Sequence, residues 1–290
     1  MTQKLDILDK LRATKYHILN PGVIFLYFGH TYYETHKAAD GYYIGPMRKA
    51  GRYHCFCIDK RPEMLKLGWR VYSTKKLFNY ATRYYEFAYD LETIDNRDQY
   101  KNSKSYYNTI TRNLKWAQEN ELKVEITPEY DVKEAYDLHK RWIKEKLEDG
   151  VYRRGFASRR YGHCLRRAPH KKDIVMLQAR LNGELVGISL MYLEADVAHE
   201  LVFHHIRIKR LSTAFALARI LKWREHGLKE FNLGGAMGSL VRLKATFPHT
   251  KLPVWMKTIV EEDMEGKPVN LHNVDGEKPI NLDEDKTAKE

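Results

Sequence analysis

Residues 173–206 read DIVMLQARLNGELVGISLMYLEADVAHELVFHHI, and this stretch decides the fold class of the chain. It contains three apolar runs of strand length, separated by two short polar segments. Asn182-Gly183 is the strongest short hairpin signal that a sequence offers, because both residue types tolerate the positive φ angles of a two-residue turn. The segment 194–198, EADVA, provides a second, looser turn. The stretch therefore predicts an antiparallel meander of three strands.

Helices are expected on both sides of this meander. Thr127-Pro128 has the pattern of an N-cap followed by proline at the first helical position, and apolar residues then recur at helical spacing up to Gly150. A second helix is predicted at 212–226, with Ser212 as its N-cap. A strand at 228–235 and extended chain at 252–260 complete this half. The order helix, three strands, helix, strand predicts an α+β fold.

The first half of the chain is less regular. Three segments have the composition of strands, at 22–28, 52–58 and 68–73, and 84–91 is a further candidate. A basic, tyrosine-rich helix is predicted at 102–121. The sequence has no exact internal repeat, although its coarse pattern of strands and helices is compatible with a similar unit in each half.

Charge is distributed unevenly along the chain. The 290 residues carry a formal net charge of +12, from 50 Lys and Arg against 38 Asp and Glu. Residues 261–290 contain ten acidic and four basic residues, so residues 1–260 carry 46 basic and 28 acidic residues, a net charge of +18. We expect a flexible acidic tail at 261–290 and a polyanionic partner for the basic remainder, although a basic surface also serves solubility alone.

The composition also bears on location and on metals. No apolar run approaches the roughly 20 residues of a membrane span, and the N-terminus lacks the apolar core of a signal peptide, so a cytoplasmic protein is expected. The three cysteines do not form a disulfide framework. Cys55 and Cys57, near His54, do not have the usual zinc spacing, and we predict buried thiols and no metal site.

The element order resembles the core of the GNAT acyltransferase fold. In that family, a turn and helix after the fourth strand bind the pyrophosphate of coenzyme A, with a basic residue and small residues in a fixed pattern. The segment KRLSTA at 209–214 is similar, with Ser212 in place of the first glycine. The resemblance implies a donor site formed by these residues and by the glycine turn: Lys209, Arg210, Ser212, Thr213, Ala214, Gly234 and Gly235.

A second resemblance concerns EFNLGGAMGSLVRLKATFP at 230–248. This segment is similar to one in Fem-type aminoacyltransferases and in phosphatidylglycerol lysyltransferase catalytic domains, where a strand ends in a glycine turn and a lysine precedes an aromatic residue. The helix segment YYNTITRNLKWA at 106–117 also resembles the linker helix of the lysyltransferases. Here Ala236 replaces an acidic residue of the lysyltransferases, and Arg242 is displaced by one position. The resemblance implies two tandem GNAT-like units and an acyl-transfer role for Lys244; the alternative is a surface lysine after a simple loop.

Acyl transfer to an amine also needs a neutral amine in the site. GNAT enzymes commonly place a carboxylate on the fourth strand, here AHELVFHHI at 198–206. Strand alternation puts Glu200 and His204 on one face and His205 on the other. All three are candidate bases, against the alternatives of structural histidines and of catalysis by proximity alone.

An arginine-rich segment follows the first predicted helix. Residues 151–172 hold six arginines and two lysines without an acidic residue, interleaved with aromatic residues, a pattern that suits phosphate contacts and base stacking. The alternative is a solvated charge run. The predicted nucleic-acid contacts are Arg153, Arg154, Arg159, Arg160, Arg166, Arg167 and, on the helix at 102–121, Arg112.

These observations predict a mixed, mostly antiparallel sheet flanked by helices, with units at 1–125 and 126–260 and a tail at 261–290. The predicted function is acyl or aminoacyl transfer of GNAT or Fem type, from acyl-CoA or aminoacyl-tRNA. A nucleic acid, tRNA or DNA, is the expected partner, and modification of a DNA or RNA base is one version of this function. Two alternatives remain open: a non-catalytic nucleic-acid-binding module on a decayed transferase fold, and a small-molecule N-acetyltransferase.

Overall fold

The computed structural model describes residues 15–18, 20–28, 36–37, 43–46, 53–57, 67–92, 104–127, 129–150, 156–194, 196–236, 244–245 and 249–264. Within these residues, eleven strands form one sheet in the order β1-β2-β3-β4-β11-β5-β10-β9-β8-β7-β6. The strands are β1 His36–Lys37, β2 Tyr43–Pro46, β3 Tyr53–Cys57, β4 Arg70–Ser73, β5 Thr82–Asp90, β6 Lys123–Thr127, β7 Ile174–Leu181, β8 Glu184–Glu194, β9 Val197–His205, β10 Glu230–Ala236 and β11 Thr250–Thr258.

The predicted meander is confirmed. β7, β8 and β9 pair antiparallel in sequence order, and β6 adds to the outer side of β7. The hairpin between β7 and β8 turns at Asn182 and Gly183, whose φ angles are 50° and 83°. Two positive φ angles in succession are the backbone that the Asn-Gly pair predicts. The sheet is mostly antiparallel, with parallel pairs at β3–β4 and β9–β10.

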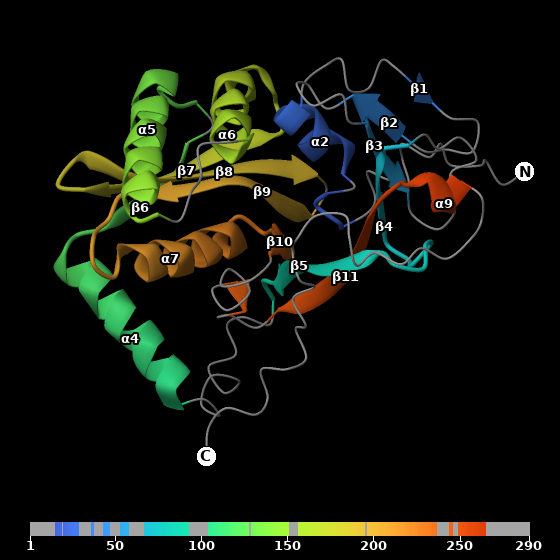
Figure 1. Cartoon of the computed structure of the whole chain (residues 1–290). Helices are drawn as coiled ribbons and strands as arrows, with labels where there is room; N and C mark the ends of the chain where they lie inside the picture. Colours follow the sequence, from blue (N-terminus) through green and yellow to red (C-terminus); the bar gives the residue numbers. More distant parts are fainter. Residues whose placement is uncertain are drawn as a thin grey trace, which may run out of the picture.

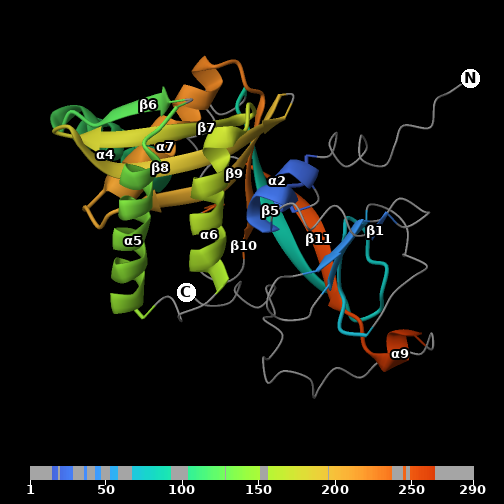
Figure 2. The same ribbon diagram turned by 90° about the horizontal axis from the view of Figure 1, so that it is seen from above.

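Helices cover both faces of this part of the sheet (Figure 1). α5 (Val132–Glu148) and α6 (Phe156–Arg167) lie on one face, and α7 (Leu211–Glu225) lies on the other. α4 (Lys104–Glu119) packs against α7, on the side away from α5 and α6. The sheet twists strongly toward β5 and β11, which Figure 2 shows steeply inclined to β7 and β8.

Two predicted helix starts are wrong. α5 does not begin at Thr127, which belongs to β6; its N-cap is Asp131, whose carboxylate accepts hydrogen bonds from the backbone N–H groups of Lys133 and Glu134. α7 begins at Leu211, after Arg210 in a left-handed conformation, so Ser212 lies inside the helix. For α7 the left-handed Arg210 reverses the chain before Ser212, whereas for α5 the capping carboxylate of Asp131 lies further along the chain than Thr127.

The prediction of a strand at 22–28 is also wrong, because Pro21–Phe28 forms α2. The side-chain oxygen of Asn20 accepts hydrogen bonds from the backbone of Gly22, at 2.9 Å, and of Val23, at 3.3 Å. Pro21 then occupies the first helical position, where its missing N–H has no cost. An N-cap followed by proline therefore outweighs the strand preference of the apolar residues.

The two halves of the chain meet where β10 leaves β9. β10 pairs with β9 only over Glu230–Asn232, opposite Val197–His199. On its other edge β10 continues along β5, with an irregularity between Asn232 and Gly235. β11, from the end of the chain, then pairs with both β5 and β4. Since β9 and β10 separate after Asn232, an opening forms in the sheet at this point.

Two groups of buried side chains stabilise the sheet. The larger lies around the meander and includes Phe215, Trp223 and Phe231, while a smaller one around β4 includes Trp69 and Val71. The sheet continues across the unit boundary that the sequence suggests near residue 125, which falls inside β6. The division into two tandem units stays a prediction. Of the tail, α9 (Glu261–Met264) is described, and residues 265–290 lie outside the described part.

Candidate active site

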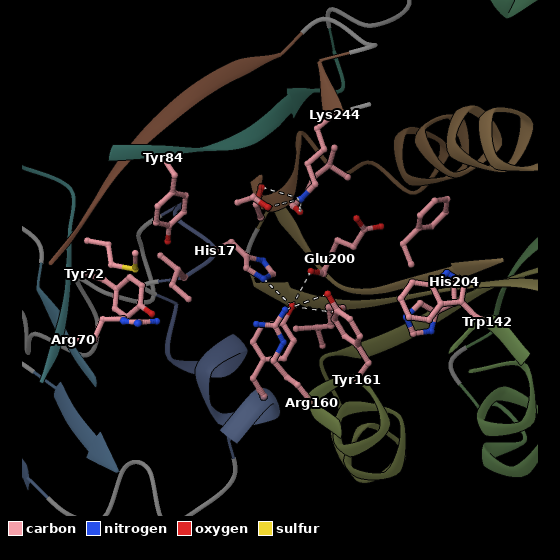
Figure 3. A pocket seen from close by; sticks show the side chains of 18 residues that line it. His17, Arg70, Tyr72, Tyr84, Trp142, Arg160, Tyr161, Glu200, His204 and Lys244 are labelled. Carbon is pink, nitrogen blue, oxygen red and sulfur yellow. Dashed lines mark hydrogen bonds between the residues drawn. The ribbon is translucent and has the colours of Figure 1, made fainter. Parts of the chain in front are cut away.

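A cavity of about 660 Å³ lies where β9 and β10 separate (Figure 3). Side chains from both halves of the chain line it, on the segment 15–18 and on α2, β4, β5, α5, α6, β9, β10 and β11. Its charged lining residues are Arg70, Arg160, Glu200 and Lys244. A cavity of this size at a break in a sheet, with few convergent polar groups, is the usual setting of a small-ligand site.

Lys244 extends into this cavity from the end of the glycine-turn segment. Its Nζ donates hydrogen bonds to the carbonyl oxygens of Leu233, of Gly234 at 3.2 Å and of Gly235 at 3.0 Å. Gly234 has a φ of 69°, a left-handed conformation that a side chain strains, and its N–H donates to Asn232 Oδ1 at 2.7 Å. The turn therefore presents three carbonyl oxygens to one ammonium group.

Opposing interactions determine the pKa of the Lys244 ammonium. Burial lowers the pKa of its ammonium to about 7, the nearby Glu86 carboxylate raises it, and the Arg219 and Arg160 guanidinium groups lower it. Lys244 therefore titrates close to neutral pH, unlike an exposed lysine. A cation in this position is poised to respond to a negative charge that develops in the cavity.

Glu86 is a charged neighbour of Lys244 that the sequence did not indicate as a site residue. It is fully buried on β5, and its carboxylate accepts hydrogen bonds from His17 N at 2.5 Å, Ile18 N at 2.8 Å and Asn232 Nδ2 at 3.1 Å. Burial raises its pKa to about 7, against the lowering effect of these hydrogen bonds and of Lys244. A glutamate amid the aromatic residues of YYEFAYDL was the available signal, because a charged group in an apolar strand needs a buried partner.

His17 is the second residue that the sequence did not indicate. It is 5% exposed and lines the cavity, and its Nε2 lies 3.1 Å from Tyr27 Oη, which donates to the carbonyl of Leu201 at 3.1 Å. A side chain at Gly234 would meet the His17 ring at 3.1 Å, so the glycine also allows this close packing. Burial, and then the neighbouring His199, Lys244 and Arg160, hold the pKa of His17 well below 6.5, so its ring is neutral.

The expectation that Glu200 and His204 share a face is wrong. The pairing of β8 and β9 shifts so that Met191 is opposite Glu200 and Leu190 is opposite Val202, which leaves Leu201 as an extra residue. This β-bulge reverses the alternation beyond it. Glu200 consequently forms an ion pair with Arg219 of α7, while His204 contacts α5 on the opposite face.

Neighbouring side chains contact both candidate bases, Glu200 and His204. The Glu200 carboxylate accepts from Arg219 and, at 3.3 Å, from Ser189 Oγ, so the carboxylate is already engaged. The His204 ring stacks on Trp142, with centroids 3.8 Å apart, and its Nδ1 lies 3.2 Å from His139 Nδ1. Burial, and then the neighbouring His139 and His205, hold the pKa of His204 well below 6.5. Both residues line the cavity; the Glu200 carboxylate is paired with Arg219, whereas His204 Nε2 is buried without a hydrogen-bond partner among the described residues.

Other predicted residues lie away from the cavity. His205 does not line it, and its Nδ1 lies 3.1 Å from the carbonyl oxygen of Ile206. The donor residues predicted around the start of α7 do not line it either: Lys209 and Arg210 are exposed, Ser212 and Thr213 are half-buried, and Ala214 is buried. Of the predicted donor site, Gly234 and Gly235 alone line this cavity.

The predicted arginine surface is not continuous in the described part of the chain. Arg153 and Arg154 lie outside the described residues, as does the side chain of Arg159. Arg166 is exposed on α6, Arg167 donates to the carbonyl of Leu26 at 3.2 Å, and Arg112 is exposed on α4, across the sheet from α6. Arg160 points into the cavity instead (Figure 3).

Residues 104–238 match the family model of the acetyltransferase (GNAT) domain. The chain carries a GNAT acyltransferase domain. The GNAT domain supplies the meander, α5, α6, α7 and β10, whereas His17, Arg70 and Lys244 of the cavity lie outside it. A comparison with curated protein sequences finds no significant match.

Solved structures share the fold at low sequence identity. The C-terminal domain of a protein described as a lysylphosphatidylglycerol synthetase from Agrobacterium fabrum has a TM-score of 0.53 and 12% identity, covering 89% of this chain and 92% of that chain. The structure of L-PGS from Bacillus licheniformis has a TM-score of 0.53 and 12% identity over 80% and 84% of the two chains. A Bacteroides thetaiotaomicron protein of unknown function has a TM-score of 0.54 and 13% identity over 76% and 83%. These similarities show the fold.

Two further observations concern the described residues alone. They contain no group of three or more His, Cys, Asp or Glu side chains that would hold a metal ion. They also contain no helix with the length and apolar character needed to cross a bilayer.

Proposed function

We propose that the protein is an aminoacyltransferase that uses the cavity between β9 and β10 as its transfer site and Lys244 as its catalytic cation. The observation that carries the proposal is the placement of the Lys244 ammonium in the cavity, on three carbonyl oxygens of the glycine turn. Fixed cations and dipoles stabilise a transition state most where they need not reorganise, and Lys244 is fixed in this sense.

The proposed reaction is attack of an acceptor amine or hydroxyl on the carbonyl carbon of an activated ester. A tetrahedral intermediate forms with a negative oxygen, and it collapses when the bond to the leaving oxygen breaks and that oxygen receives the proton that the acceptor nitrogen or oxygen loses. Lys244 stabilises the negative oxygen, which takes the place of the carbonyl of Gly235, the most exposed of its three contacts. Because the Glu200 carboxylate is paired with Arg219 and burial holds the pKa of His204 well below 6.5, orientation of the reactants contributes most of the remaining rate.

We favour aminoacyl-tRNA over acyl-CoA as the donor. The residues at the start of α7 that resemble the coenzyme A motif carry Ser212 in place of glycine and lie outside the cavity lining. The excess of basic residues over 1–260 suits a nucleic-acid partner. Two proteins of the same fold are described as lysylphosphatidylglycerol synthetase or L-PGS, and an aminoacyl ester donor is consistent with such a name.

The test is a transfer assay with the full chain and matched donors. Radiolabelled aminoacyl-tRNA and radiolabelled acetyl-CoA are each incubated with a phospholipid extract, duplex DNA, RNA and polyamines, and labelled product is measured after its separation from the labelled donor. We expect label transfer from aminoacyl-tRNA, with binding of the tRNA that weakens steeply as salt concentration rises. Transfer from acetyl-CoA alone would replace this proposal with an N-acetyltransferase. Tight binding of nucleic acid without any transfer would favour the non-catalytic module, and label transferred to a base of the added DNA or RNA would identify a base-modifying enzyme.

A further inference from the structure

Arg160 presents most of its hydrogen-bonding capacity to the cavity. A guanidinium group has five N–H donors. Within the described part of the chain, the Arg160 side chain makes one hydrogen bond, in which Nη2 donates to Tyr161 Oη at 3.2 Å. Its Nε is buried and has no partner there. Burying such a donor without a partner is costly, which indicates that a ligand completes the site.

The guanidinium group is held in place by aromatic rings rather than by a carboxylate. Its central carbon lies 4.2 Å from the centroid of the Tyr27 ring and 5.0 Å from that of Tyr161. No ion pair joins Arg160 to an acidic residue among the described residues. Its position is therefore fixed while its charge remains available, the arrangement expected of a preformed anion site.

A second arginine faces the same cavity from β4. Arg70 lines the cavity together with Tyr72 (Figure 3), and the Arg70 Nε is buried without a partner among the described residues. Both guanidinium groups act on the Tyr72 hydroxyl: burial raises its pKa, and Arg70 and Arg160 each lower it. Arg70 and Arg160 thus line one cavity from two different elements, β4 and α6.

The positive charges of the residues that line the cavity outnumber the negative ones. Glu200 is the acidic residue among the lining residues, and its carboxylate is paired with Arg219, outside the lining. Arg70 and Arg160 therefore face the cavity without an acidic partner in it. An anionic group in the cavity would supply acceptors to both guanidinium groups, whose Nε atoms have no partner among the described residues.

We propose that Arg160 and Arg70 form a binding site for a phosphate group of the substrate. A phosphate has more acceptor oxygens than a carboxylate and a stronger charge, so it uses two guanidinium groups from different elements at once. The inference rests on the proposed function in one respect: it assigns to the transfer cavity a substrate that carries phosphate. That phosphate belongs either to a nucleotide, as in the tRNA end, or to a glycerophosphate headgroup.

Calorimetric titration of the full chain at low ionic strength tests the site without requiring any turnover. The probes are inorganic phosphate, AMP, glycerol 1-phosphate and, as a carboxylate, acetate. We expect phosphate to bind and Arg160→Gln to weaken its affinity about tenfold or more, since charge-assisted hydrogen bonds are lost. Arg160→Lys should recover part of the affinity, and Arg70→Gln should weaken it independently. Arg141→Gln is the matched control, because Arg141 is exposed on α5 and pairs with Glu184 outside the cavity.

The outcomes separate this site from the proposed function. Tighter binding of AMP than of glycerol 1-phosphate would assign the site to a nucleotide, and the reverse order would assign it to a headgroup. Equal affinity of the wild type and both cavity variants for phosphate would overturn the site, and so would acetate binding as tightly as phosphate. If transfer activity is absent while phosphate affinity depends on Arg160, the transferase proposal fails and the site stands. If transfer proceeds and Arg160→Gln binds phosphate normally, the site alone fails.

Discussion

Replacing Lys244 by methionine should lower kcat for aminoacyl transfer by about 10²- to 10³-fold, the cost of removing one fixed donor from an oxyanion site. Methionine keeps most of the volume of the side chain but removes the ammonium group that the carbonyl oxygens of Leu233, Gly234 and Gly235 hold in the cavity. Because this cation acts mainly on the charge that develops during reaction, donor affinity should change less than about threefold. Single-turnover transfer rates and equilibrium donor binding measure the two quantities separately.

The control for this variant is Lys222→Met. Lys222 lies on α7 and pairs with Glu225 at the surface, so its replacement removes the same charge from the protein without changing the cavity. The account is wrong about Lys244 if both variants retain wild-type kcat. It is also wrong if Lys244→Met reduces only donor affinity, because the lysine would then serve binding rather than the transition state.

Replacing Arg219 by methionine should lower the free energy of unfolding by about 3–5 kcal/mol, the usual effect of leaving a buried charge without its partner. The Arg219 side chain is 4% exposed and that of Glu200 is 10% exposed. The guanidinium also lies over the rings of Phe203, at 4.1 Å, and Phe231, at 4.9 Å. Urea denaturation of the wild type and the variant measures the difference.

A double variant identifies the cause of this loss. Arg219→Met combined with Glu200→Gln removes both charges, so it should be more stable than Arg219→Met alone. The comparison variant is Arg180→Met, which breaks a half-exposed ion pair with Glu134 and should cost no more than about 1 kcal/mol. If the double variant is no more stable than Arg219→Met, the unpaired carboxylate is not the reason for the loss.

The parts of the fold that the sequence predicted correctly are those with local signals. The meander follows from apolar runs and from Asn182-Gly183, whose effect on the backbone extends over a few residues. The first half was harder, because the signal that makes Pro21–Phe28 a helix is the side chain of Asn20 and not the helix composition. The pairing of β11 with β5 joins segments more than 150 residues apart in the sequence, and no local pattern encodes it.

The candidate site shows the same division. The glycine turn with Lys244 was visible in the sequence because turn and lysine are close along the chain. Glu86 and His17 were not, since their hydrogen bond joins residues that are 69 positions apart. The roles expected of Glu200 and His204 depended on strict strand alternation, which a bulge at Leu201 interrupts. Such an irregularity arises from strand pairing and cannot be read from residue types alone.

The pH dependence of kcat/KM for transfer tests most directly whether Lys244 acts as a cation in the cavity. Its pKa is lowered to about 7, so the protonated fraction is full below that pH and is lost as the pH rises through it. We therefore predict a rate that falls above about pH 7. In Glu86→Gln this fall should move to lower pH, because the Glu86 carboxylate raises the pKa of Lys244, and in Lys244→Arg it should disappear. A pH profile that neither Glu86→Gln nor Lys244→Arg changes would contradict the account.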